Sequence, residues 1–172
     1  MKAIILFIIL SINIFSQPQP LKTVEYVDIN KYLGLWYEIA KIPNRFQSHC
    51  VKGTTAKYSL SENGEIEVIN SCIEEDGSTN QAKGVAKIVD KKSNAKLEVS
   101  FFSILGWRPI WGDYWIIGLD TNYQWAIVGT PSRKYGWVLS RSPKLEKDTL
   151  EKIFRILREQ GYNPQNFEFS KQ

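Results

Sequence analysis

The chain contains 172 residues, of which 43% are hydrophobic, 23% charged and 13% aromatic. A chain of this length and composition can bury one hydrophobic core, which excludes a disordered tail and a mini-protein stapled by disulfides or metals. Its 22 Lys and Arg and 18 Asp and Glu give a net charge of +4. The basic residues are scattered singly and in pairs, so we expect no nucleic-acid partner.

Residues 1–16 have the features of a secretory signal peptide. Lys2 precedes an apolar run, and the small residue Ser16 ends the segment. A membrane anchor is the alternative, but the run is shorter than the roughly 20 residues that a spanning helix needs. No cysteine follows it for lipid attachment. We therefore expect a soluble, secreted or periplasmic protein whose residues 17–172 form a single domain.

The rest of the chain reads as a series of short strands followed by one helix. The expected strands are residues 36–40, 54–60, 65–72, 84–90, 96–102, 114–120, 125–130 and 135–141. Asn63-Gly64 gives the strongest hairpin signal. Apolar residues then recur with helical spacing from Leu150 to Leu157, before Gly161, and a short extended piece covers 166–169. This pattern predicts an all-β fold, an eight-stranded antiparallel up-and-down β-barrel with one C-terminal α-helix on its wall, and a β-sandwich is the alternative.

The two cysteines, Cys50 and Cys72, leave two interpretations open. An oxidising compartment favours a disulfide. A hairpin closed at Asn63-Gly64, however, places Cys72 opposite about residue 54 or 55, so a bridge requires the loop before that strand to fold back. Two buried thiols are the alternative.

Three segments resemble the signature sequences of the lipocalins. They are Gly34-Leu35-Trp36, Asp120-Thr121-Asn122-Tyr123 and Arg141, in the order and at the spacing of a barrel. The segment GLWYEIAKIPNRF resembles in particular the bacterial lipocalin and apolipoprotein D branch, whereas Asn122 departs from the usual Thr-Asp-Tyr. The resemblance implies that Arg141 lies across Trp36 and closes one barrel end, a contact worth about 0.5 to 2 kcal/mol. We therefore expect structural roles for Gly34, Trp36, Asp120, Tyr123 and Arg141.

The two-residue period of a strand predicts which side chains line the barrel. With Trp36 and Arg141 placed inward, the expected ligand-binding residues are Glu38, Ala40, Ala56, Tyr58, Val68, Asn70, Tyr114, Ile116, Ala126, Val128, Tyr135, Trp137 and Leu139. Small residues, among them Ala40 and Gly118, leave room for a ligand. No Lys or Arg of this inward set lies above the barrel floor. The only histidine is His49, so we expect neither a metal site nor a cofactor.

This lining predicts a non-catalytic protein that carries or scavenges a small lipophilic ligand. Glu38, Asn70 or a tyrosine hydroxyl would fix one polar end of the ligand, although internal hydrogen bonds are the alternative for Glu38. The lipocalin resemblance implies a fatty acid, a lysophospholipid or a similar membrane-derived lipid. We expect a monomer or a weak homodimer.

A lipocalin-type isomerase or thiol-dependent enzyme is the alternative function. Cys72 has inward parity and would be its nucleophile. The strand pattern places no histidine near Cys72 and no basic partner to lower the pKa of its thiol. We therefore expect no enzymatic activity.

The connection between the fifth and sixth strands is unusually apolar, with seven large apolar residues among residues 101–111. Loops at the open end of a barrel normally carry polar residues. Leu105, Trp107 and Ile110 are therefore predicted to touch a membrane interface. The alternative is a lid in which Phe101, Ile104 and Trp111 fill the mouth.

Overall fold

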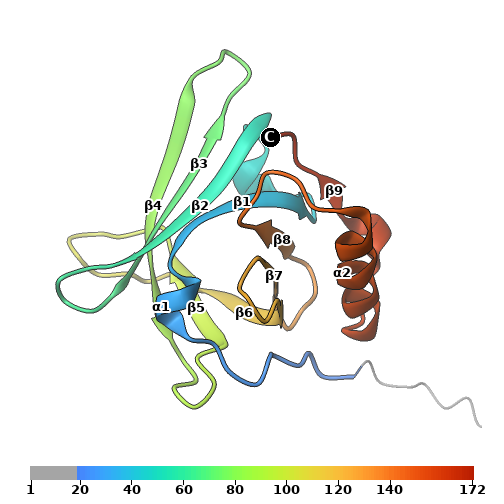
Figure 1. Ribbon diagram of the computed structural model, residues 1–172. Coiled ribbons are helices and arrows are strands. Elements are labelled where there is room, and N and C mark those ends of the chain that lie inside the picture. The colour runs from blue at the N-terminus through green and yellow to red at the C-terminus, as the bar shows by residue number, and fades with distance from the viewer. Residues whose placement is uncertain (1–18) are drawn as a thin grey trace, which may run out of the picture.

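The computed structural model describes residues 19–172, so the predicted signal peptide lies outside the described residues. Nine antiparallel strands form one sheet in the order β2-β3-β4-β5-β6-β7-β8-β1-β9, and β2 also pairs with β1 (Figure 1). The strands are β1 (Gly34–Lys41), β2 (Lys52–Leu60), β3 (Ile66–Ile73), β4 (Thr79–Ile88), β5 (Lys96–Ser100), β6 (Gly112–Leu119), β7 (Trp125–Gly129), β8 (Gly136–Ser140) and β9 (Glu168–Phe169). The first eight strands close on themselves, so the predicted barrel is confirmed and the sandwich alternative is wrong.

One long helix, α2 (Lys147–Glu159), packs beside the barrel, as the apolar spacing predicted (Figure 1). Its Ile153 and Leu157 are fully buried against the outer face of the wall. Three short helices were not predicted, namely α1 (Ile29–Tyr32), η1 (Arg45–Gln47) and η2 (Pro164–Asn166). Within residues 19–172 no helix is both long and apolar enough to cross a membrane.

The β2–β3 hairpin has the predicted turn and register. Gly64 adopts a φ of +77°, which favours glycine, and Leu60 pairs with Ile66. The register continues to the Thr55–Ser71 pair and then shifts by one residue. This register determines where the second cysteine meets the loop before β2.

Most strand boundaries lie within two residues of the prediction, and the start of β4 is the exception. β4 begins at Thr79, five residues earlier than expected, because β3 offers it backbone partners as far as Ile73. Residues 79–83, in which Ala82 is the only apolar residue, carry no apolar alternation that would have indicated a strand. β5 ends at Ser100, and the side chain of Phe101 lies against Gly84, where a Cβ would be only 2.7 Å from the ring.

The barrel wall separates two buried apolar clusters. The interior cluster contains eight of the predicted lining residues: Ala56, Tyr58, Val68, Tyr114, Ile116, Ala126, Val128 and Leu139. Trp137 packs against it from the side of the mouth. The outer cluster joins the wall to α2. Strand alternation thus placed most of the predicted residues on the correct side.

Two β-bulges reverse the alternation and correct two predictions. In β1 the register shifts between Glu38 and Ala40, and Ala40 packs in the outer cluster, not in the barrel. In β6 the register shifts between Ile116 and Gly118, so Gly118 pairs with the outward Ile127. Neither small residue opens space for a ligand.

The β1 bulge also places a lysine at the barrel mouth. Lys41 pairs with Trp137, and its Nζ lies 3.1 Å from Oε1 of Glu38. The prediction that no inward Lys or Arg lies above the floor is therefore wrong. The extra residue of the bulge reverses the alternation after Glu38, so the side chain of Lys41 faces the barrel mouth.

Candidate functional site

The closed end of the barrel is held by Arg141. Its guanidinium carbon lies 3.7 Å from the ring centroid of Trp36. Its nitrogens donate hydrogen bonds to the backbone carbonyls of Lys31, Tyr32, Leu33, Leu35 and Tyr123. Partial burial lowers the pKa of this guanidinium. These contacts join the segment before β1 to the end of β8.

The remaining signature residues shape the same end. Gly34 has a φ of +97°, and a Cβ there would lie 3.3 Å from a guanidinium nitrogen of Arg141. The Asp120 carboxylate accepts a hydrogen bond from the backbone N–H of Asn122 at 3.0 Å. Because the donor is the backbone N–H of residue 122, the presence of Asn there instead of the usual Asp leaves this bond intact. The Tyr123 hydroxyl accepts from the backbone of Asp28 at 2.8 Å.

Three buried tyrosines lie above this floor. The Tyr114 hydroxyl is 2.8 Å from the hydroxyls of both Tyr32 and Tyr58. Burial raises the pKa of all three, that of Tyr58 to about 12. The enclosed void that they line with apolar neighbours measures only about 10 Å³. The lower barrel is therefore filled by protein.

Glu38 is the buried charge of the upper barrel, with 3% of its surface exposed. Its carboxylate oxygens accept hydrogen bonds from Lys41 Nζ at 3.1 Å, Gln47 Nε2 at 2.6 Å and Ser170 Oγ at 2.6 Å. Internal hydrogen bonds, the alternative considered for this residue, are thus present. They come from Lys41 of β1, from the loop between β1 and β2 (the mouth loop) and from the C-terminal segment, not from Tyr or Arg141 as expected.

The loop between β1 and β2 is fastened to β8 through aromatic side chains. Trp137 Nε1 donates to Gln47 Oε1 at 3.0 Å. Tyr135 stacks on Trp137 with an interplanar angle of 15°, and the ring centroids of Phe46 and Tyr135 lie 5.7 Å apart. The predicted Tyr135 and Trp137 therefore lie together at the mouth. Asn70 pairs with Ala56, one of the interior residues, farther along β3.

A cavity with a volume of about 550 Å³ lies beside this loop. It is bounded by the β1–β2 loop, the start of β2 and the C-terminal segment. The lining residues are Lys41, Pro43, Asn44, Arg45, Gln47, Ser48, Cys50, Val51, Lys52, Thr54, Glu168, Phe169, Ser170 and Lys171. We call this cavity the mouth cleft. Sequence reasoning missed it because its walls are far apart in the chain.

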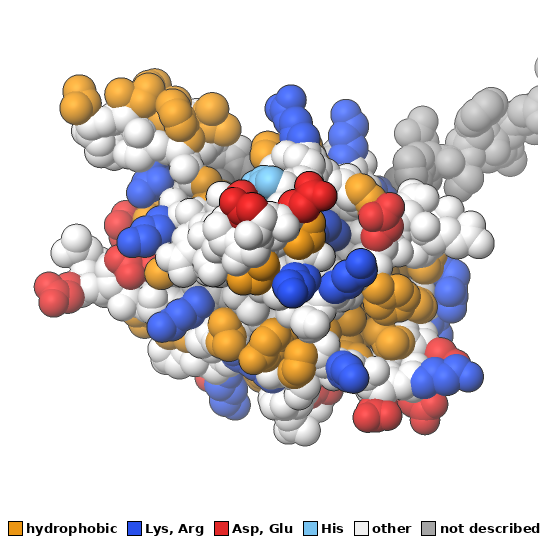
Figure 2. Space-filling model, turned by 90° about the horizontal axis from the view of Figure 1, so that it is seen from above, with side chains coloured by type: hydrophobic (Ala, Val, Ile, Leu, Met, Phe, Trp, Pro, Cys, Tyr) orange, Lys and Arg blue, Asp and Glu red, His pale blue; other side chains and the backbone are white. Residues whose placement is uncertain are grey.

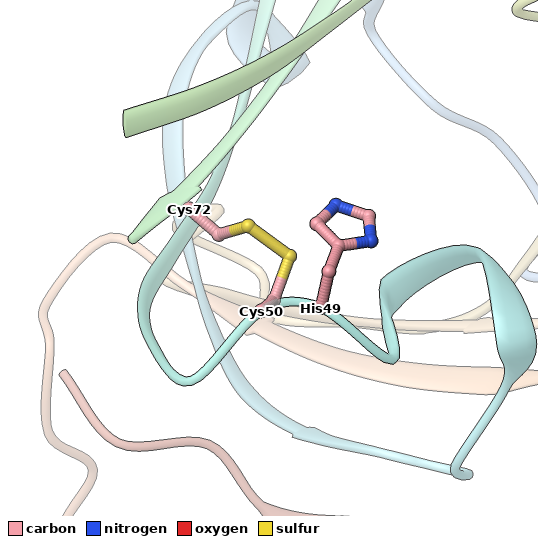
Figure 3. A group of neighbouring side chains, drawn as sticks. All are labelled: His49, Cys50 and Cys72. Atoms are coloured by element: carbon pink, nitrogen blue, oxygen red, sulfur yellow. A yellow bond between two sulfur atoms is a disulfide. The ribbon is translucent and has the colours of Figure 1, made fainter. Parts of the chain in front are cut away.

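Cys50 and Cys72 form a disulfide with a Cα–Cα distance of 5.5 Å (Figure 3). The bridged alternative is confirmed, and the loop folds back through a hydrogen bond from Val51 N to Ile73 O. His49 has a ring nitrogen within 4.8 Å of both sulfur atoms, so the expectation of no nearby histidine is wrong. The disulfide leaves neither cysteine as a thiolate for catalysis or metal binding.

The β5–β6 connection presents an apolar tip. Ile104 and Trp107 pair across a tight turn, and Leu105, Trp107 and Ile110 expose 104%, 67% and 63% of their surfaces. In Figure 2 hydrophobic side chains gather on a lobe at the upper left, on the side where Figure 1 places this connection. Ile104 is also exposed, so the lid alternative is wrong for it, whereas the ring of Phe101 lies against Gly84, the partner of the interior residue Val68.

The chain has relatives among known proteins. A sequence model of the lipocalin-like domain matches residues 27–172. Temperature-induced lipocalin-1 of Arabidopsis thaliana is 36% identical over 86% of this chain and 81% of that protein. The outer membrane lipoprotein Blc of Vibrio cholerae is 34% identical over 95% and 94%, and mouse apolipoprotein D is 40% identical over 80% and 72%.

Solved structures show the same fold at lower identity. Insecticyanin from the tobacco hornworm Manduca sexta superposes with a TM-score of 0.73 and 22% identity, covering 91% of this chain and 86% of that one. The cockroach allergen Per a 4 superposes with a TM-score of 0.67 and 21% identity, covering 91% and 94%. At these identities the likeness supports the fold alone.

Proposed function

The chain belongs to the lipocalin family, and from this premise we propose that it binds a membrane-derived lipid, a fatty acid or lysophospholipid, with the lipid chain entering the barrel mouth. The observation that carries the proposal is the contrast between the two ends of the barrel. The closed end is packed with aromatic rings, whereas the mouth combines Trp137 and Tyr135 with hydrogen-bonding groups. An apolar wall with a few polar groups at one end suits an amphiphile.

The predicted lining residues take different parts in this proposal. Tyr58 and Tyr114 form the floor on which the chain end would rest, together with Ile116, Ala126 and its strand partner Leu139. Trp137, its strand partner Val128 and Tyr135 form the wall near the mouth. Glu38 is fully engaged with protein partners, so its role is to hold the mouth loop in position and not to bind the ligand directly.

Tryptophan fluorescence tests the binding proposal. Titration with lauric acid is expected to quench the fluorescence of the native protein, and Trp137→Phe should remove most of the change. Trp125→Phe is the matched control, because Trp125 is buried in the outer cluster beside α2. Quenching that depends on Trp125 and not on Trp137 would contradict the mouth as the entry point.

The apolar tip at residues 104–110 supports a second step, contact with a membrane from which the lipid is taken. A tip of this kind places Leu105, Trp107 and Ile110 in an interface, and tryptophan favours the headgroup region. Arg108 adds a positive charge that attracts anionic lipids. The lipid would then pass to the neighbouring mouth without crossing water.

Vesicle co-sedimentation tests this contact. Trp107→Ser with Ile110→Ser should lower binding to vesicles of mixed zwitterionic and anionic lipids, whereas affinity for lauric acid in solution should hold. Leu60→Ser with Val89→Ser is the matched control, since these exposed residues lie at the closed end. Equal vesicle binding by the tip variant and the native protein would refute the contact.

The disulfide supports export to an oxidising compartment, as the signal sequence predicts. It also weighs against the thiol-dependent enzyme, because that activity needs Cys72 as a thiolate. Titration with a thiol reagent under native conditions should find no reactive cysteine. A rapidly reacting thiol would revive the enzymatic alternative.

A further inference from the structure

The mouth cleft carries an excess of positive charge. Its lining includes Lys41, Arg45, Lys52 and Lys171, and the only carboxylate among its lining residues is Glu168. Lys41 is neutralised by its ion pair with Glu38. Three cations then stand against one carboxylate, an excess of +2 in a cavity of about 550 Å³.

Covalent and backbone links hold the walls of the cleft in place. The Cys50–Cys72 disulfide ties the mouth loop to β3. β9 pairs with the end of β1, and Gly53 N donates to the carbonyl of Lys171 at 2.7 Å. The cationic side chains therefore project from segments whose backbones are fixed before any ligand arrives. Preorganisation of this kind reduces the cost of ordering a site on binding.

The same cleft adjoins the barrel mouth. Gln47 lines the cleft and also bonds to Trp137, which packs against the interior cluster. Of the hydroxyl groups in the lining, those of Ser48 and Ser170 already donate to protein oxygens, and Thr54 carries a third. An amphiphile with its chain in the barrel can therefore place its head group among the cations of the cleft.

We propose that the mouth cleft binds a phosphate monoester, the head group of a lipid whose chain occupies the barrel. This inference rests on the proposed lipid-binding function and specifies the class of lipid. A phosphate monoester carries about −1.5 to −2 charge at neutral pH, which matches the excess of +2. A carboxylate would leave one positive charge unmatched, and a neutral head group would leave two.

Isothermal titration with three probes tests the proposal: monododecyl phosphate, 1-dodecanol and inorganic phosphate, each at monomeric concentration. The native protein should bind monododecyl phosphate at least about tenfold more tightly than 1-dodecanol, because close charge pairs add affinity. Inorganic phosphate should bind far more weakly than either lipid analogue and should compete poorly, since it lacks the chain.

A charge-matched pair of triple variants gives the control. The cleft variant combines Arg45→Gln, Lys52→Gln and Lys171→Gln. It should weaken monododecyl phosphate binding by about tenfold or more and change 1-dodecanol binding by less than about twofold. The control variant combines Lys57→Gln, Lys83→Gln and Lys92→Gln, which remove the same charge from exposed positions away from the cleft. It should change the affinity for monododecyl phosphate and for 1-dodecanol by less than about twofold.

Each contrary result identifies which idea fails. Equal loss in the two triple variants would assign the effect to net charge and overturn the cleft. Binding of 1-dodecanol as tight as that of monododecyl phosphate would overturn the head-group proposal and leave lipid binding standing. Strong competition by inorganic phosphate would assign the cleft to free phosphate. Failure of both lipid analogues to bind would refute the lipid-binding function together with this inference.

Discussion

Removing the guanidinium of Arg141 tests whether the closed end is a structural clamp. Arg141→Ala deletes a cation–π contact with Trp36 at 3.7 Å and hydrogen bonds to five backbone carbonyls. Trp36 itself is fully buried, so the missing side chain leaves its ring partly uncovered. The segment before β1 then loses its link to β8.

The expected loss of stability is about 3.5 to 5 kcal/mol. The cation–π contact contributes about 0.5 to 2 kcal/mol. A hydrogen bond from a charged donor contributes about 1.5 to 3 kcal/mol when buried, but several of these carbonyls lie near the surface, where water replaces the lost donor. We therefore count roughly two hydrogen bonds and not five, each at the lower value of about 1.5 kcal/mol. In a domain of this size the loss lowers the melting temperature by about 7 to 20 °C.

Urea denaturation and calorimetry measure this loss, with lauric acid affinity measured below the melting temperature. Lys152→Ala is the control, because Lys152 lies 5.2 Å over the ring of Trp125 but is itself exposed. It should cost less than about 1 kcal/mol. An Arg141→Ala protein that keeps its stability would refute the structural assignment of Arg141, whether or not it still binds lauric acid.

Three further substitutions test other parts of the barrel. Burial raises the pKa of Tyr58 to about 12 from an unfolded value of 10.0, so its contribution to stability is complete below pH 10 and is lost as the pH rises toward 12, at up to about 1.4 kcal/mol per pH unit. Tyr58→Phe should make urea denaturation less dependent on pH in this window, and an unchanged slope would contradict the burial argument. Cys50→Ala with Cys72→Ala opens a loop with a sequence separation of 22 and should cost about 3 kcal/mol in the same assay, whereas a loss below about 1 kcal/mol would show that the disulfide adds little. Gly118→Ala places a Cβ 2.8 Å from the buried Ile127 and should cost about 1 to 3 kcal/mol by calorimetry, and an unaltered melting temperature would show that the β6 bulge relaxes freely.

Local periodicity was sufficient for the architecture. The two-residue alternation placed Ala56, Tyr58 and Val68 on the inner face, and the turn chemistry of Asn63-Gly64 set the β2–β3 register. These features depend on neighbours in sequence, and the sequence contains them directly. The clamp of Arg141 on Trp36 was accessible only through the family signature.

The mouth depends on information that local periodicity does not carry. A single bulge after Glu38 turned Ala40 outward and brought Lys41 to the mouth, and no propensity rule marks that residue as the bulge.

The partners of Glu38 show the same limit at long range. Ser170 reaches the carboxylate across a separation of 132 residues, and residues 168–171 form one wall of the mouth cleft. The sequence by itself therefore determined the barrel, its helix and most of its inner face. Only the tertiary structure decided the charge and shape of the mouth, because those depend on backbone irregularities and on contacts between segments that meet only after the barrel has closed.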